Sequence, residues 1–86
     1  MVEQFDLQPT RRMIVETLEE LSGINKSGAY FSKEAILYFD GRFKKTDLEV
    51  FNHALDSLSS EGRIGNELIV SNITPKESYQ VYRSRK

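Results

Sequence analysis

The sequence contains no cysteine and only one histidine, His53. Without cysteine there is no disulfide framework and no thiolate ligand for a metal. The five glycines are scattered singly along the chain, so it has no glycine-rich phosphate loop. A lone histidine without an identified acid or nucleophile partner is a weak basis for catalysis. We therefore expect no enzyme activity, no metal site and no cofactor.

The chain also lacks any long hydrophobic run. No apolar stretch approaches the roughly 20 residues that span a bilayer, and the first residues, MVEQFDLQ, lack the basic and apolar regions of a secretory signal. We therefore expect a soluble, cytoplasmic protein with no membrane partner. At 86 residues the chain should form a single domain. Its core should cover about residues 9–83, followed by a frayed tail from Ser84 onward.

A strong net charge of either sign is absent as well. The formal net charge is −1, which gives no global attraction to nucleic acid and no repulsion strong enough to exclude it. The charges are unevenly distributed, with net values of 0 over residues 1–45, −4 over residues 46–61 and +3 over residues 62–86. The middle segment is thus the acidic part of the chain, and the last third is the basic part.

Apolar residues at helical spacing predict two helices in the first half. The first should begin near Pro9, whose fixed φ suits a first turn, and end at Gly23 as C-cap. The second should have Ser32 as N-cap and cover about residues 33–39. The expected core-facing residues of these two helices are Ile14, Val15, Leu18, Leu21, Ala35, Ile36 and Phe39.

A third helix has the clearest start signal in the chain. Thr46 and Glu49 have the spacing of a capping box, in which the threonine hydroxyl accepts from the Glu49 N–H. Gly62 should end this helix. Its apolar stripe, expected to face the core, consists of Val50, Phe51, Ala54, Leu55 and Leu58.

The remaining segments have the pattern of strands. Residues 67–71 and 78–83 predict two antiparallel strands joined by a turn over residues 72–77, and a short strand is expected around residues 29–31. Tyr79 and Tyr82 should point to opposite sides of the last strand, which leaves one of them exposed. The phenylalanines expected in the core are Phe5, Phe31, Phe39 and Phe51.

The order of these elements, three helices and then a hairpin, resembles the winged-helix superfamily, a variant of the helix-turn-helix. The closest local match is the run Ala54-Leu55-x-x-Leu58-x-x-Glu61-Gly62-x-Ile64, which is similar to the way many winged-helix domains pass from the third helix to the wing. The resemblance implies an α+β winged helix-turn-helix, with three helices followed by a two-stranded β-wing and a short strand between helices 1 and 2. Such domains occur in transcription regulators, replication factors and protein-interaction modules.

In DNA-binding members of the superfamily the third helix enters the major groove and the wing meets phosphate or the minor groove. The resemblance therefore implies a small winged-helix DNA-binding protein, either a transcription regulator or a replication accessory, with double-stranded DNA as its partner. Asn52 has the chemistry to read adenine, while the wing and the lysines before the third helix should hold the backbone. The residues expected to contact nucleic acid are Lys44, Lys45, Asn52, His53, Arg63, Lys76 and Arg83.

The acidic outer face of the third helix supports an alternative. Carboxylates placed between groove phosphates weaken the counterion-release term that dominates affinity for DNA. The same face suits a protein-interaction module that docks a basic partner through Asp47, Glu49 and Asp56. Acids in a first helical turn also stabilise the helix dipole, which gives Asp47 and Glu49 a purely structural explanation.

The N-terminal segment raises a further expectation of self-association. Val2, Phe5 and Leu7 alternate with polar residues, a pattern that suits an edge strand or packing on a neighbouring copy. DNA readers of this type often work as dimers across two half-sites, so a homodimer is a further hypothesis.

Overall fold

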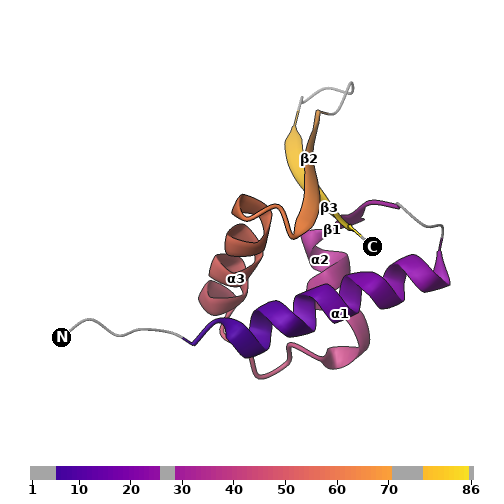
Figure 1. Ribbon diagram of the computed structural model, residues 1–86. Helices are drawn as coiled ribbons and strands as arrows, with labels where there is room; N and C mark the ends of the chain where they lie inside the picture. The colour runs from indigo at the N-terminus through magenta and orange to yellow at the C-terminus, as the bar shows by residue number, and fades with distance from the viewer. Residues whose placement is uncertain (1–5, 26–28, 71–76, 86) are drawn as a thin grey trace.

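The computed structural model describes residues 6–25, 29–70 and 77–85. Within these ranges the chain has the α+β class that the sequence predicts, with three α-helices and a three-stranded antiparallel sheet. Figure 1 shows the helices gathered at one end, with β2 and β3 projecting from them as a ribbon. The elements are α1 (Gln8–Ile24), β1 (Phe31–Ser32), α2 (Lys33–Leu37), the 3₁₀ turn η1 (Phe39–Gly41), α3 (Leu48–Ser60), β2 (Ile64–Val70) and β3 (Ser78–Ser84).

Helix α1 begins where Pro9 predicts but does not end at Gly23. The helix continues through Gly23 to Ile24, and Asn25 is its C-cap. Both the backbone N–H and the side-chain amide of Asn25 donate to the carbonyl of Leu21, each at 3.0 Å. Because these donors satisfy a carbonyl of the last turn, the helix ends without a left-handed glycine.

Leu7 precedes α1 as its N-cap, and this position corrects part of the self-association hypothesis. Its backbone is helical rather than extended, with φ −82° and ψ −12°. Its side chain is half-buried against the hydrophobic core. Leu7 therefore belongs to the fold of its own chain, whereas Val2 and Phe5 lie outside the described residues.

Helix α2 starts at the predicted cap but is shorter than predicted. The Ser32 hydroxyl accepts from the Ala35 N–H at 3.1 Å, yet the helix stops at Leu37. The left-handed backbone of Asp40 (φ 55°) and Gly41 (φ 66°) turns the chain immediately afterwards. With so few helical residues only Ile36 is fully buried; Ala35 is exposed, contrary to prediction, and Phe39 is partly buried.

Helix α3 begins one residue later than the capping box predicts. The N-cap is Asp47, whose Oδ1 accepts from the Glu49 N–H at 2.9 Å. Thr46 does not cap the helix, because the Glu49 N–H that its hydroxyl was predicted to accept from donates to Asp47 instead. The Thr46 N–H belongs to the preceding turn and donates to the Phe43 carbonyl at 3.0 Å. The predicted end at Gly62 is confirmed: this residue has φ 72° and closes a Schellman motif.

That motif consists of two hydrogen bonds across the end of α3. The Gly62 N–H donates to the Ser59 carbonyl at 3.1 Å, and the Arg63 N–H donates to the Leu58 carbonyl at 3.0 Å. Together they satisfy carbonyls that the helix would otherwise leave free, and they send the chain directly into β2.

The hydrophobic core lies where α1 and α3 meet α2 and the base of the sheet. Most of the predicted stripe residues are buried, and Phe43 joins them with an edge-to-face contact to Phe51 at 4.9 Å between ring centroids. Val15, Val50 and Phe31 are only partly buried. The buried hydrophobic residues are Ile14, Leu18, Leu21, Ile36, Phe43, Phe51, Ala54, Leu55, Leu58, Ile64, Val81 and Tyr82.

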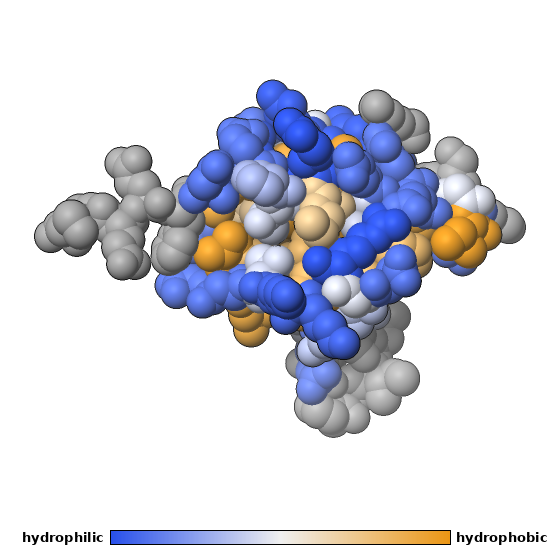
Figure 2. Space-filling view, turned by 90° about the horizontal axis from the view of Figure 1, so that it is seen from below, coloured by the Kyte–Doolittle hydropathy of each residue, from blue (hydrophilic) through white to orange (hydrophobic). Residues whose placement is uncertain are grey.

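The outer surface is mainly polar on the side opposite the ribbon. Figure 2, which views the molecule from below, shows hydrophilic residues over most of that face and hydrophobic ones in separate patches. Hydrophobic surface is therefore concentrated at particular places, and these places are candidates for contacts with other molecules.

The two predicted C-terminal strands belong to a three-stranded sheet with the order β1-β3-β2. β2 starts at Ile64, three residues before the predicted strand. Ile64 pairs with Ser84, which is buried, so Ser84 belongs to the sheet and not to a frayed tail as predicted. Tyr82 is buried and Tyr79 is exposed, as the alternation predicts. Residues 71–76, most of the predicted turn, lie outside the described residues.

Candidate functional site

The exposed face of α3 carries a short polar row that we call the α3 stripe. Its members are Glu49, Asn52, His53 and Asp56, whose spacing of three, four and seven residues puts them on one side of the helix. Glu49, His53 and Asp56 are exposed and Asn52 is partly exposed. Because the sequence has no lysine or arginine between Thr46 and Glu61, α3 provides no cation to offset the two carboxylates.

Acidic character extends from α3 towards the sheet around Tyr82. Burial raises the pKa of the Tyr82 hydroxyl, and the negative charges of Asp56 and Glu34 raise it further. Since these charges act on the same hydroxyl, α2 and α3 each contribute a carboxylate to this corner. A pocket of about 260 Å³ opens here, lined by Lys33, Glu34, Tyr79, Gln80 and Tyr82.

Asp47, the third acid of the protein-interaction hypothesis, has a structural task. Its carboxylate caps α3 by accepting from the Glu49 N–H, an arrangement that stabilises helices by about 1 kcal/mol. The acids of α3 that are free to meet a partner are therefore Glu49 and Asp56, the two in the α3 stripe.

Glu61, at the C-terminal end of α3, holds three elements together. Its carboxylate accepts from Arg11 of α1 at 2.7 Å, from Arg63 next to β2 at 3.1 Å and from the Ser57 hydroxyl at 3.1 Å. The hydrogen bond from Arg11 is the main cause of a lowered pKa for Glu61. Arg63, predicted to contact DNA, is thus already engaged by a carboxylate of its own chain.

The structure places the basic residues that were expected to contact nucleic acid far apart. Lys44 and Lys45 are exposed in the turn before the N-terminus of α3, whereas Arg63 follows its C-terminus. At about 1.5 Å per residue, the helix between them is roughly 20 Å long. Lys76 lies outside the described residues.

Arg83 occupies a third, separate place. It alternates with Tyr82 and Ser84, which are buried on the helix side, so it projects from the opposite face of the sheet. There its guanidinium carbon lies 5.5 Å from the centroid of the Tyr30 ring. Its side chain also covers Gly65 so closely that a Cβ there would meet Arg83 Cγ at 2.8 Å.

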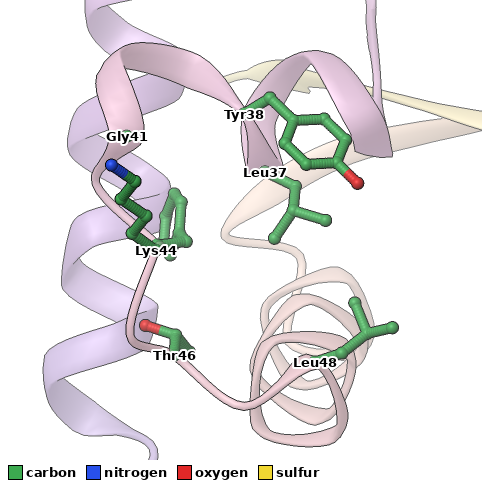
Figure 3. A pocket seen from close by; sticks show the side chains of 7 residues that line it. Leu37, Tyr38, Gly41, Lys44, Thr46 and Leu48 are labelled. Atoms are coloured by element: carbon green, nitrogen blue, oxygen red, sulfur yellow. The ribbon is translucent and has the colours of Figure 1, made fainter.

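A groove opens beside the N-terminus of α3, between this helix and the segment that joins it to α2 (Figure 3). Its volume is about 500 Å³. Phe43 is 3% exposed and forms the floor, while Tyr38 and Leu48 are 75% and 53% exposed at its sides. The lining residues are Leu37, Tyr38, Gly41, Phe43, Lys44, Thr46 and Leu48.

Arg42, which lies between the lining residues Gly41 and Phe43, fixes this wall of the groove to α1. This guanidinium forms an ion pair with Glu20, lies 3.4 Å from the Thr17 hydroxyl through Nη1, and stacks over the Phe39 ring with its carbon 5.1 Å from the centroid. The hydrogen bond from Arg42 lowers the pKa of Glu20. These contacts hold the turn that follows η1 in one position.

Sequence reasoning missed this groove. The Asp40-Gly41 pair did signal a turn, but nothing in the spacing revealed that α2 would end early enough to expose Tyr38. Leu48 lies three residues before Phe51 and so fits the buried stripe of α3, yet it is exposed because the first turn of α3 extends beyond the core.

A second apolar surface lies at the far end of the β2–β3 ribbon. Leu68 and Val70 project from one face, Ile69 and Tyr79 from the other, and all four are exposed. The ribbon extends away from α1 and α3 in Figure 1, and Tyr79 shares a pocket with Lys33 and Glu34 of α2.

The described residues contain neither a metal-binding cluster nor a membrane-spanning helix. No group of three or more histidine, aspartate or glutamate side chains there has the arrangement to hold a metal ion. In the same part of the chain, no helix is long and apolar enough to cross a membrane.

No family model, curated protein or solved structure matches the chain. The functional inference therefore rests on three features of the molecule itself, namely the acidic α3 stripe, the dispersed cations and the groove.

Proposed function

We propose that this chain is a winged-helix protein-interaction module that docks a basic partner on the α3 stripe. The observation that carries the proposal is the charge of the exposed surface of α3. Glu49 and Asp56 stand free on it, with Asn52 and His53 between them as hydrogen-bonding groups. A lysine- or arginine-rich surface complements this row in both charge and hydrogen bonding.

The order and the junctions of the elements support the winged-helix part of the proposal. Three helices precede the β2–β3 ribbon, and the Schellman motif at Gly62 leads α3 directly into that ribbon. In this arrangement α3 corresponds to the recognition helix and the ribbon to the wing. The α3 stripe is then the surface with which such a domain meets its partner.

The placement of the cations argues against a strong DNA reader. Affinity for duplex DNA depends on many phosphate contacts made by one basic surface. Here the described candidates are divided among the turn before α3, the Glu61 ion pairs and the far face of the sheet. A duplex lying along α3 would meet Lys44 and Lys45 at one end and carboxylates along the rest.

DNA binding remains the second candidate because of those two lysines. Lys44 and Lys45 are adjacent and exposed just before the N-terminus of α3, and Asn52 is available for adenine. A transcription regulator or replication accessory that relied on this end of α3 would bind DNA weakly and with a shallow dependence on salt, because few phosphate contacts release few counterions.

The test compares two double variants that change net charge equally. The first variant, Glu49→Lys/Asp56→Lys, reverses the charge of the α3 stripe. The second, Glu67→Lys/Glu77→Lys, reverses two exposed acids outside the stripe, one in β2 and one directly before β3. Affinity capture with the full chain should recover basic proteins with the wild type and the second variant and lose them with the first. Equal recovery by both variants would contradict the proposal.

A mobility-shift assay with a random duplex at low salt separates the two candidates. Under the leading proposal the wild type leaves the duplex unshifted. A shift that disappears in Lys44→Glu/Lys45→Glu would instead establish the DNA-binding alternative.

A further inference from the structure

We propose that the groove beside the N-terminus of α3 binds a protein segment in which a large apolar side chain stands next to a carboxylate. This site is separate from the α3 stripe, and it does not depend on the function proposed above. The occupant is an acidic, aromatic or leucine-containing peptide segment of another protein.

The size and lining of the groove suit a large apolar side chain. Its volume of about 500 Å³ falls within the roughly 300–1,000 Å³ of typical ligand sites. The buried ring of Phe43 is part of the lining. Leu37, Tyr38 and Leu48 provide apolar walls, as Figure 3 shows. Tyr38 and Leu48 are large hydrophobic residues that are exposed, so an occupant would cover apolar surface that now faces water.

The charge of the lining residues favours a carboxylate next to the apolar side chain of the bound peptide. Lys44 is the charged residue among the seven that line the groove, and the lining contains no carboxylate. The two acids nearest to Lys44 along the chain have contacts of their own: Asp40 lies 4.0 Å from Arg42 Nε, and Asp47 caps α3. Glu49, the next acid, is exposed and is not among the lining residues. The ammonium group of Lys44 is thus placed to pair with a carboxylate that enters beside the apolar side chain.

The groove is formed before any partner arrives. Arg42 ties its outer wall to α1 through Glu20 and Thr17, and the buried ring of Phe43 packs edge-to-face on Phe51. A site whose walls are already fixed loses little conformational freedom on binding. Asp40, which precedes the lining residue Gly41, has a left-handed backbone, the kind of non-glycine outlier that clusters at binding sites.

The experiment is a titration of the ¹⁵N-labelled full chain with short peptides, followed by amide chemical shifts. The probe is the capped hexapeptide EDFLDE. One control, QNFLNQ, replaces each carboxylate by an amide, and a second, EDAADE, removes the apolar side chains. The probe should shift amides of residues 37–48, the first control should bind about two- to fivefold more weakly, as expected for loss of an exposed ion pair, and the second should produce no shift.

Variants of the chain give an independent readout with a matched control. Lys44→Gln should weaken binding of the probe about two- to fivefold, while Lys45→Gln, which removes the same charge outside the lining, should leave it unchanged. Leu48→Ala should weaken it about tenfold, with the unshifted remainder of the spectrum reporting an intact fold. Shifts located on the β2–β3 ribbon, no shift at all, or equal effects of the two lysine variants would each overturn the proposal.

Discussion

The two ends of α3 use their charged side chains in opposite ways. At the C-terminal end, Glu61 is bound by Arg11 and Arg63, so acid and base neutralise each other at the junction of α1, α3 and β2. At the N-terminal end, Lys44 and Lys45 are exposed and form no ion pair with any residue in the described ranges. One end holds the fold together, and the other presents its charges to the surroundings.

This difference shows why a list of basic residues is a poor guide to a binding surface. Arg63 would have to give up its contact with Glu61, at 3.1 Å, before it could meet a phosphate, whereas Lys44 has no such contact to break with any residue that the structure describes. The apolar groove lies at the end where the charges are free. The N-terminal end of α3 therefore combines the properties of a contact site, and the C-terminal end those of a structural joint.

The largest effect should come from removing the floor of the groove. Phe43→Ala deletes a buried ring packed on Phe51, and such changes cost about 3–5 kcal/mol. For a domain with a total stability of about 4–13 kcal/mol, the variant should be largely unfolded or melt far below the wild type by circular dichroism. Tyr38→Ala, at an exposed ring of the same groove, should change the stability by less than about 0.5 kcal/mol. Equal losses of stability in the two variants would mean that the buried ring of Phe43 does not stabilise the N-terminal end of α3.

The sequence predicted the starts and the stripes of the helices because these depend on nearby residues. As predicted, α1 begins near Pro9, α2 is capped by Ser32, and Gly62 ends α3. The apolar stripes of α1 and α3 are buried around Ile14 and Phe51. Two caps were wrong because a neighbour had equal chemistry: Asp47 replaced Thr46, and Asn25 made a glycine cap unnecessary. Local patterns do not decide between adjacent polar side chains.

The site was harder to predict because it depends on how distant segments are placed. A single DNA-binding surface that includes both Lys44 and Arg63 requires these residues to lie close together, and the length of α3 keeps them apart. The groove exists because Asp40 and Gly41 turn the chain after only five helical residues of α2. A turn signal in a sequence shows that the chain bends, but it does not show which side chains the bend will expose.

An intermediate effect is expected at the C-terminal joint of α3. Gly62→Ala forces a side chain into a backbone with φ 72°, at a cost of about 1–2 kcal/mol. Gly23→Ala is the matched control, since Gly23 is helical and a Cβ there would meet nothing within 4 Å. It should stabilise the protein by up to about 1 kcal/mol. Urea unfolding of both variants should show a loss of stability in Gly62→Ala and a gain in Gly23→Ala. A loss of stability in both would contradict the helical assignment of Gly23.

The smallest effect is a dependence on pH that separates the two ends of α3. The Arg11 hydrogen bond lowers the pKa of Glu61 in the folded chain below its ordinary value of 4.5. A depressed folded pKa stabilises the protein above the unfolded pKa, and this contribution disappears as the pH falls through the folded pKa. Wild type should thus lose stability on acidification below about pH 4.5, and Glu61→Gln should lose less over the same interval. Lys44→Gln, at the unpaired end, should follow the wild-type profile in thermal melts between pH 7 and 3, because Lys44 contributes no ion pair to the described fold.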